Sequence, residues 1–182
     1  MTRLILVKHA MPIIDANVPA KDWQLSEAGR IQSLHLAERL RRYRPHRVFT
    51  SREPKAAETG DLLAVALKIP VEAIDDLHEQ TRANEGYHSA EVFRGKIRAF
   101  FEQPNALVFG TETADAAYTR FAAALDHLSA QHPNETLIIA THGTVIALFL
   151  ARRAGLAPFE VWESLTLPDY RVFDNTTQQL VE

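Results

Sequence analysis

The sequence predicts an α/β fold: a three-layer α/β/α sandwich with a mostly parallel central sheet and a C-terminal antiparallel hairpin. Short aliphatic runs at residues 4–7 and 137–140 are typical of buried strands in parallel sheets. Segments with apolar residues at helical spacing alternate with such runs, which favours helices packed on both faces of one sheet. Near the end of the chain, residues 170–173 and 178–181 flank a polar turn at 174–177, and this pattern predicts the hairpin.

In the first half of the chain, a strand is expected at residues 3–8, and Ser26 is a suitable N-cap for the helix that follows. A second short strand is expected at residues 48–50. Pro54 suits the first turn of a helix that runs to about Leu67, and a third short strand is expected within residues 69–74. The apolar residues that recur at helical spacing in the first helix are Ala28, Ile31, Leu34, Ala37 and Leu40.

In the second half, residues 75–87 are polar and predict a loop, and residues 89–101 and 113–130 predict two helices. A strand at residues 136–140 and a helix at 143–154, ended by Gly155, follow. The tail then forms the hairpin. At 182 residues, with no internal repeat and no interdomain linker, the chain predicts a single domain over residues 1–182. Apolar residues expected on the inner sides of the two helices are Val92, Phe93, Ile97, Phe100, Ala117, Phe121, Ala124, Leu125 and Leu128.

Bulk properties exclude several classes of function. The net charge of −3 and the pI of about 6.2 give no reason to expect a nucleic-acid partner. The arginines at residues 39–47 are interpreted as a solvated helix end. The chain has no cysteine, which excludes disulfides and thiolate chemistry. No segment approaches the roughly eighteen apolar residues of a membrane span, and no leader sequence opens the chain, so we expect no membrane association and a cytoplasmic location.

Two histidines, each directly after an aliphatic run, mark the candidate site. His9 follows the first strand and His142 follows the strand at 136–140. Because ligands bind at the carboxyl ends of parallel strands, both imidazoles are expected in one crevice. Lys8 would attract an anion and lower the pKa of a neighbouring imidazole, and Gly143 opens a helix whose N-terminus suits phosphate. The alternative is a pair of ordinary buried histidines.

Two further segments could serve the same site. Ser51, Arg52 and Lys55 follow the second strand and open a helix, where a phosphate would be bound; the alternative is a charged, solvated first turn. Glu79 could donate a proton, and Glu85 competes with it for that role. Taken alone, each of these two acids would be interpreted as an ordinary surface residue, because glutamate is mostly exposed in proteins.

The order of these segments resembles the histidine phosphatase superfamily, which includes phosphoglycerate-mutase-like proteins, and in particular its small phosphatase branch. The resemblance covers residues 4 to about 150. The superfamily has Arg-His-Gly after the first strand, a Leu-Thr-x-x-Gly-x-x-Gln element, a Ser-x-x-x-Arg-Ala-x-x-Thr segment, an acid after Leu-x-Glu, a Glu before a long helix, and a second His-Gly. The matching residues are Lys8-His9-Ala10, residues 25–32, residues 51–59, Glu79, Glu112 with Arg120, and His142-Gly143.

The resemblance implies a phosphomonoester hydrolase that works through a phosphohistidine on His9. Lys8, Lys55 and His142 would hold the phosphoryl oxygens, and Glu79 would protonate the leaving oxygen. The implied partner is a small phosphorylated substrate or a phosphate ion. No cofactor and no metal are implied, because the cationic pocket offsets the charge that a metal would offset. The sequence does not indicate an oligomeric state.

Three departures from the superfamily pattern leave alternatives open. Lysines stand at positions 8 and 55 in place of arginines, and Ala10 stands in place of a glycine. Lysine keeps the charge but loses the bidentate grip on phosphate. A regulatory module that binds phosphate with little turnover is therefore one alternative, and a mutase-type phosphotransferase is another. A nucleotide-binding domain is disfavoured, because no Gly-x-Gly-x-x-Gly or Walker sequence follows the first strand.

Substrate contacts are expected from residues 11–24 and 75–110, by position alone. Apolar residues in these two segments could form a lid over the site, and some of them could equally belong to the core. They are Met11, Ile13, Tyr87, Phe93 and Phe109.

Overall fold

The computed structural model describes residues 2–83 and 85–182. Its centre is a six-stranded sheet in the order β3-β2-β4-β1-β5-β6. The four strands from β3 to β1 are parallel, whereas β5 runs antiparallel to β1 and β6 antiparallel to β5. The mostly parallel sheet and the C-terminal antiparallel pair confirm the predicted fold class. The strands are β1 (Arg3–Lys8), β2 (Arg47–Ser51), β3 (Val71–Ile74), β4 (Thr136–Thr141), β5 (Asp169–Asp174) and β6 (Gln179–Leu180).

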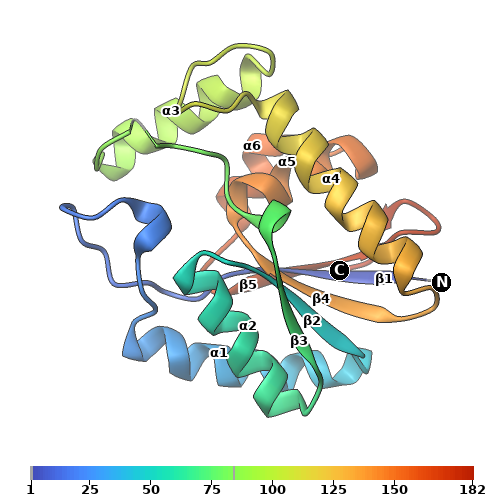
Figure 1. Ribbon diagram of the computed structural model, residues 1–182. Helices are drawn as coiled ribbons and strands as arrows, with labels where there is room; N and C mark the ends of the chain where they lie inside the picture. Colours follow the sequence, from blue (N-terminus) through green and yellow to red (C-terminus); the bar gives the residue numbers. More distant parts are fainter. Residues whose placement is uncertain (1, 84) are drawn as a thin grey trace.

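Helices cover both faces of the sheet and complete the three layers (Figure 1). One face carries α1 and α2, and the other carries α4 and α5, with α3 and α6 packed further out. Ser26, Ser89 and Thr113 cap α1, α3 and α4 through their side-chain oxygens, as expected of N-cap residues. The helices are α1 (Glu27–Leu40), α2 (Pro54–Leu67), α3 (Ala90–Glu102), α4 (Ala114–Gln131), α5 (Gly143–Ala154) and α6 (Pro158–Ser164). No helix within the described ranges is long and apolar enough to cross a bilayer.

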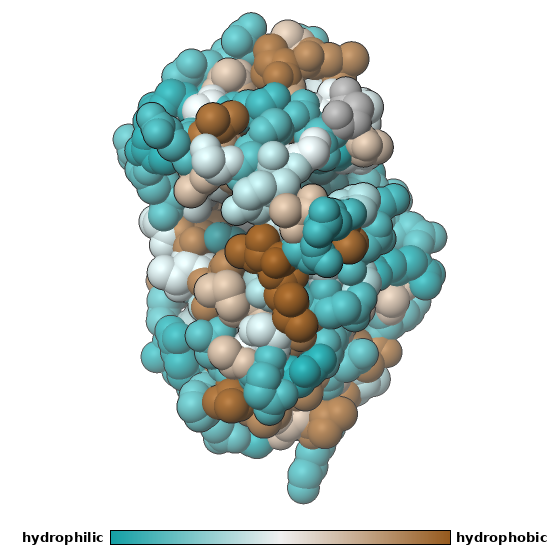
Figure 2. Space-filling view, turned by 90° about the vertical axis from the view of Figure 1, so that its left-hand side faces the viewer, coloured by the Kyte–Doolittle hydropathy of each residue, from teal (hydrophilic) through white to brown (hydrophobic). Residues whose placement is uncertain are grey.

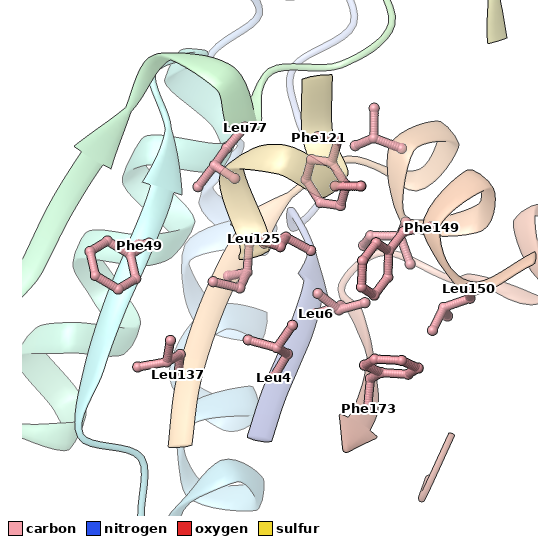
Figure 3. Close-up of a cluster of buried hydrophobic side chains, with 14 of the residues drawn as sticks. Leu4, Leu6, Phe49, Leu77, Phe121, Leu125, Leu137, Phe149, Leu150 and Phe173 are labelled. Atoms are coloured by element: carbon pink, nitrogen blue, oxygen red, sulfur yellow. The ribbon is translucent and has the colours of Figure 1, made fainter. Parts of the chain in front are cut away.

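The core lies on both sides of the sheet because successive side chains of a strand point to opposite faces. Leu4 and Leu6 of β1 pack on the side of α4 and α5, together with Phe121 and Phe149 (Figure 3). The alternate residues of β1 pack on the side of α1 and α2. Both faces of β1 and β4 are thus buried, which explains why their sequences are continuous aliphatic runs.

The buried face of α1 differs in part from the one that its apolar spacing predicts. Ile31 and Leu34 are 49% and 45% exposed, although they were expected to share a face with Ala37 and Leu40. The buried side of α1 also uses small residues, because α1 lies close to its neighbours there. The short helix α6 was not expected from the sequence. Val92, expected on the inner side of α3, is exposed.

Gly29 is the position where this close approach is tightest. A β-carbon there would lie 2.3 Å from the main-chain oxygen of Met11. We expect Gly29→Ala to lower the free energy of unfolding by roughly 1–3 kcal/mol, as overpacking does, although alanine is normally the better helix former. The matched control is Gly95→Ala in α3, where a β-carbon meets no atom within 4 Å. Denaturant unfolding should show Gly95→Ala unchanged or more stable; a stabilised Gly29→Ala would contradict the steric argument.

Candidate functional site

The candidate site lies at the carboxyl ends of three neighbouring strands. His9 directly follows β1, Ser51 is the last residue of β2, and His142 directly follows β4, which lies between them in the sheet. The main-chain N–H of His9 donates to the Thr141 oxygen at 2.9 Å, so the parallel pairing of β1 and β4 continues to the histidine itself. The two imidazole rings consequently meet with their centroids 5.3 Å apart and their planes at 64°.

The hydrogen bonds of His9 determine which nitrogen is free. Its Nδ1 lies 2.8 Å from the main-chain oxygen of Ala10. A carbonyl oxygen can only accept, so in the neutral ring Nδ1 carries the proton and Nε2 carries a free lone pair. The loop is held in turn by Thr59, whose hydroxyl accepts from the Ala10 N–H at 3.1 Å. His9 is therefore an imidazole locked in the tautomer that presents a nucleophilic Nε2.

In the opposing ring, His142, the other nitrogen is the one that has a hydrogen-bond partner. Its Nε2 lies 2.9 Å from the Ser51 hydroxyl, which also accepts the N–H of Glu53 at 3.2 Å. When the Ser51 hydroxyl donates its proton to His142 Nε2, the ring proton of the neutral histidine lies on Nδ1. His142 Nδ1 is buried and has no partner among the described residues. A buried ring nitrogen without a partner is uncommon in proteins, and in the tautomer with the proton on Nδ1 an oxygen of a bound anion would satisfy it.

Two lysines border the imidazole pair. Lys55 Nζ donates to the Ala20 oxygen at 2.7 Å and to Glu53 Oε2 at 2.6 Å. Lys8 Nζ donates to the Leu165 oxygen at 2.9 Å. Burial lowers the pKa of Lys8, partly offset by the nearby carboxylate of Glu79. Lys55 is buried and Lys8 is half-buried, and both lie close enough to His9 for their charges to lower its pKa.

Gly143 begins α5, and the Lys8 side chain packs against it. A β-carbon on Gly143 would lie 3.3 Å from Lys8 Cε. The absence of a side chain here lets Lys8 lie close over the first turn of α5.

Glu79 reaches the same place from the loop after β3. Its carboxylate accepts the Gln80 N–H at 2.9 Å through Oε1 and the Thr144 N–H at 3.2 Å through Oε2. Burial alone would raise the pKa of Glu79, but the charges of Arg82 and His142 and the hydrogen bond from Gln80 outweigh it and lower the pKa. In the free protein Glu79 is therefore ionised.

The structure places two of the predicted candidates elsewhere. The Arg52 side chain is 63% exposed and pairs with Asp75, so it does not turn toward the histidines. Glu85 accepts from His88, Lys96 and the Gly110 N–H, and these partners outweigh its burial and hold its pKa at about 2. Because Arg52 begins the turn before α2 whereas Lys55 lies in its first turn, only the latter faces inward.

Sequence reasoning missed Arg82, Thr144 and Glu53. Arg82 lies 3.6 Å from Glu79 Oε2 and donates to the Thr144 hydroxyl at 2.8 Å. Its guanidinium stands 5.0 and 5.1 Å from the ring centroids of Phe93 and Phe109. No spacing rule signals such an arginine in a polar loop; its position three residues after Glu79 was the one available hint.

The segments expected to contact substrate lie on one side of the molecule. Of the predicted lid residues, Met11, Ile13 and Tyr87 are exposed, whereas Phe109 is buried in the core beside Phe93. Figure 2 looks at the side of the molecule that carries the chain between β1 and α1, and its apolar surface gathers in a central band within a mainly hydrophilic face. The burial of Phe109 shows that this residue belongs to the core rather than to a lid. Asn84, within the predicted loop, lies outside the described residues.

The two buried histidines make the stability of the fold depend on pH. Burial lowers the pKa of His9 well below its usual value, as do the charges of His142 and Lys55; burial and Lys55 do the same for His142. The histidines of the unfolded chain take up protons near pH 6.5, whereas those of the folded chain do so only at lower pH. The free energy of unfolding is therefore at its full value above pH 6.5, and it decreases as the pH falls from 6.5 to the lower pKa of the folded state.

Between pH 6.5 and 5, we therefore expect the free energy of unfolding to decrease by up to about 1.4 kcal/mol per pH unit for each histidine. Denaturant titrations at pH 7.5, 6 and 5 measure it. His142→Gln should have a shallower slope than the wild type. An equal slope in both proteins would show that other groups are responsible.

Comparisons with known proteins identify the family to which this chain belongs. The family model of the histidine phosphatase superfamily (branch 1) matches residues 4–172. A metal-independent phosphoserine phosphatase of Arabidopsis thaliana is 30% identical over 162 residues, which are 82% of this chain and 68% of the relative. Phosphoglycerate mutase-like protein 4 of the same plant is 29% identical, over 84% of this chain and 70% of its own.

Solved structures share the fold at lower identity. YhfR of Bacillus stearothermophilus aligns with a TM-score of 0.79 at 20% identity, covering 99% of this chain and 94% of its own. A phosphoserine phosphatase variant of Entamoeba histolytica, solved with phosphoserine, aligns with a TM-score of 0.78 at 19% identity, covering 100% and 96%. With a family model matched from the first strand to β5, this chain belongs to branch 1 of the histidine phosphatase superfamily.

Proposed function

We propose that the protein is a phosphomonoester hydrolase whose nucleophile is His9. One observation carries the proposal: a buried imidazole with a free Nε2 faces a second buried imidazole whose Nδ1 has no partner within the described ranges. In the proposed reaction His9 Nε2 is the nucleophile, and His142 carries its proton on Nδ1 and donates it to the substrate. A phosphoryl group between them would use both.

The reaction has two steps. His9 Nε2 attacks phosphorus as the ester P–O bond breaks, and Glu79 gives a proton to the leaving oxygen. Water then attacks the phosphohistidine, with the Glu79 carboxylate accepting a proton, and the P–N bond breaks to release phosphate and restore His9. Lys8, Lys55 and the N–H of His142 would hold the phosphoryl oxygens and offset the charge that accumulates in the transition state.

The low pKa of free Glu79 is compatible with its role as an acid. A phosphoryl dianion that enters beside the carboxylate adds negative charge, which raises the pKa of Glu79 and favours its protonated form. Arg82, 3.6 Å from the same carboxylate, then limits this rise. We therefore expect the hydrolysis to be fastest at mildly acidic pH.

Release of phosphate from p-nitrophenyl phosphate in the presence of EDTA tests the proposal. The panel of substrates includes phosphoserine, 3-phosphoglycerate and glucosyl-3-phosphoglycerate. Structures similar to this chain include an Entamoeba histolytica phosphoserine phosphatase solved with 3-phosphoglyceric acid and a mycobacterial glucosyl-3-phosphoglycerate phosphatase. Hydrolysis without added metal is expected. Isomerisation of 3-phosphoglycerate without net release of phosphate would instead identify a mutase.

One observation favours a second function, a phosphate-binding module with little turnover. Both lysines that replace the superfamily's arginines are already engaged by main-chain oxygens, Lys8 by Leu165 and Lys55 by Ala20. Such a module would bind inorganic phosphate in calorimetry without hydrolysing any ester of the panel. Lys8→Arg combined with Lys55→Arg should then raise the activity, and no response would count against this second function.

A further inference from the structure

Glu53 is a mostly buried acid within the proposed phosphate site, and the superfamily pattern assigns it no role. It precedes α2 at the N-cap position, but its carboxylate makes no capping hydrogen bond. The side chain is only 13% exposed and turns toward the site. A carboxylate is buried at a cost unless it is paired and hydrogen-bonded, so its partners indicate what it does.

The Glu53 carboxylate has two hydrogen-bond partners, and both belong to the proposed machinery. Glu53 Oε2 accepts from Lys55 Nζ at 2.6 Å, and Oε1 accepts the main-chain N–H of Glu79 at 2.9 Å. The same Oε1 lies 3.6 Å from His142 Nε2. One carboxylate therefore links the lysine of α2 that is proposed to bind phosphate with the loop that carries the proposed proton donor, and it lies beside the second imidazole.

We propose that Glu53 is a positioning residue, which holds Lys55 and the Glu79 loop in place for phosphoryl transfer. The inference rests on the proposed function and adds a residue to it. Glu53 acts through Lys55 and Glu79 and does not touch the substrate.

The chemistry of lysine explains the need for such a residue. An arginine is a rigid, planar fork that fits a phosphoryl group without further support, whereas lysine is a point charge on a flexible four-carbon stem. Lys55 uses two of its three N–H bonds on the Ala20 oxygen and Glu53. These two acceptors fix the ammonium group, and the third N–H remains for a phosphoryl oxygen.

The opposite role would be inhibition, in which the carboxylate competes with the phosphoryl group for Lys55. The two roles predict opposite effects of removing the carboxylate on turnover and on anion binding. Without its positioning carboxylate, the site should lose transition-state stabilisation, whereas without a competitor it should bind anions more tightly and turn over at least as fast.

The experiment compares Glu53→Ala and Glu53→Asp with Glu58→Gln. Glu58 lies on the same helix, where its carboxylate pairs with Arg30 near the surface, 2.5 Å from Nε. We expect kcat of Glu53→Ala to fall by about ten- to a hundredfold, as for a misplaced catalytic group, with KM changed less than about threefold because ground-state binding is largely retained. Glu53→Asp keeps the charge and should recover part of the loss, and Glu58→Gln should behave as the wild type.

A double-mutant cycle separates this role from a general loss of structure. In a Lys55→Ala background, Glu53→Ala should cost less than in the wild type, because the lysine that it positions is gone. Thermal unfolding of each variant shows whether the fold is retained. Additive losses, or kcat and KM of Glu53→Ala equal to those of the wild type, would overturn the inference while leaving the hydrolase proposal intact.

Vanadate binding gives a readout that does not need turnover. Calorimetry should show weaker binding of vanadate, which imitates the transition state, to Glu53→Ala, and a smaller change for inorganic phosphate. Tighter binding of both anions would identify Glu53 as a competitor and overturn the inference. A wild type that hydrolyses no ester would contradict the proposed function, and the vanadate result would still decide the role of Glu53.

Discussion

His9→Ala is expected to lower the hydrolysis of p-nitrophenyl phosphate by about a thousandfold or more, as the loss of a nucleophile does in other enzymes. The physical reason is the locked tautomer: Nδ1 is held by the Ala10 oxygen, and no other side chain of the site presents a free nucleophilic nitrogen with the same orientation among the residues described. Phosphate release under saturating substrate measures the effect.

Acid quenching of the wild type during turnover, and detection of a phosphorylated histidine, adds the second readout. The label should be absent from His9→Ala. His35→Ala, an exposed histidine of α1, is the matched control and should keep both the activity and the label. Full activity in His9→Ala, or a label that persists in it, would remove His9 from the proposed role.

Glu79→Gln is expected to reduce kcat by about a hundred- to a thousandfold for an alkyl phosphate such as phosphoserine, in the range of general acid–base catalysis. Glutamine can still accept the N–H of Gln80, but it cannot donate a proton to the leaving oxygen. For p-nitrophenyl phosphate, the first step should be affected far less, because p-nitrophenolate leaves without a proton. Parallel assays of both substrates measure this difference.

Glu85→Gln is the control for this prediction, since Glu85 was the competing candidate. Its carboxylate is engaged by Lys96 and His88, and its pKa of about 2 keeps it ionised. For both substrates, kcat of Glu85→Gln should equal that of the wild type. If Glu85→Gln had the leaving-group dependence and Glu79→Gln did not, the roles of the two acids would be exchanged.

The order of the elements other than α6 was predictable, because each of them leaves a local pattern. Pro54 marks the start of α2, Gly155 the end of α5, and the aliphatic runs mark β1 and β4. Spacing alone could not tell which side of α1 is buried, since that depends on how closely α1 approaches the chain at Met11. There a main-chain oxygen excludes even a β-carbon from Gly29, so the buried side contains small residues that carry little hydrophobic signal.

The same division holds for the candidate site. The sequence by itself determined the fold class and the family pattern, and placed His9 and His142 at the carboxyl ends of two strands, because these depend on periodicity and on residues adjacent to strands. That these two strands are neighbours in the sheet is known from the structure. Only the tertiary structure decided that Arg52 turns to solvent and that Glu53 and Arg82 join the site. Those outcomes depend on side-chain direction and on contacts between segments that lie far apart along the chain, and a linear pattern of residue types contains neither.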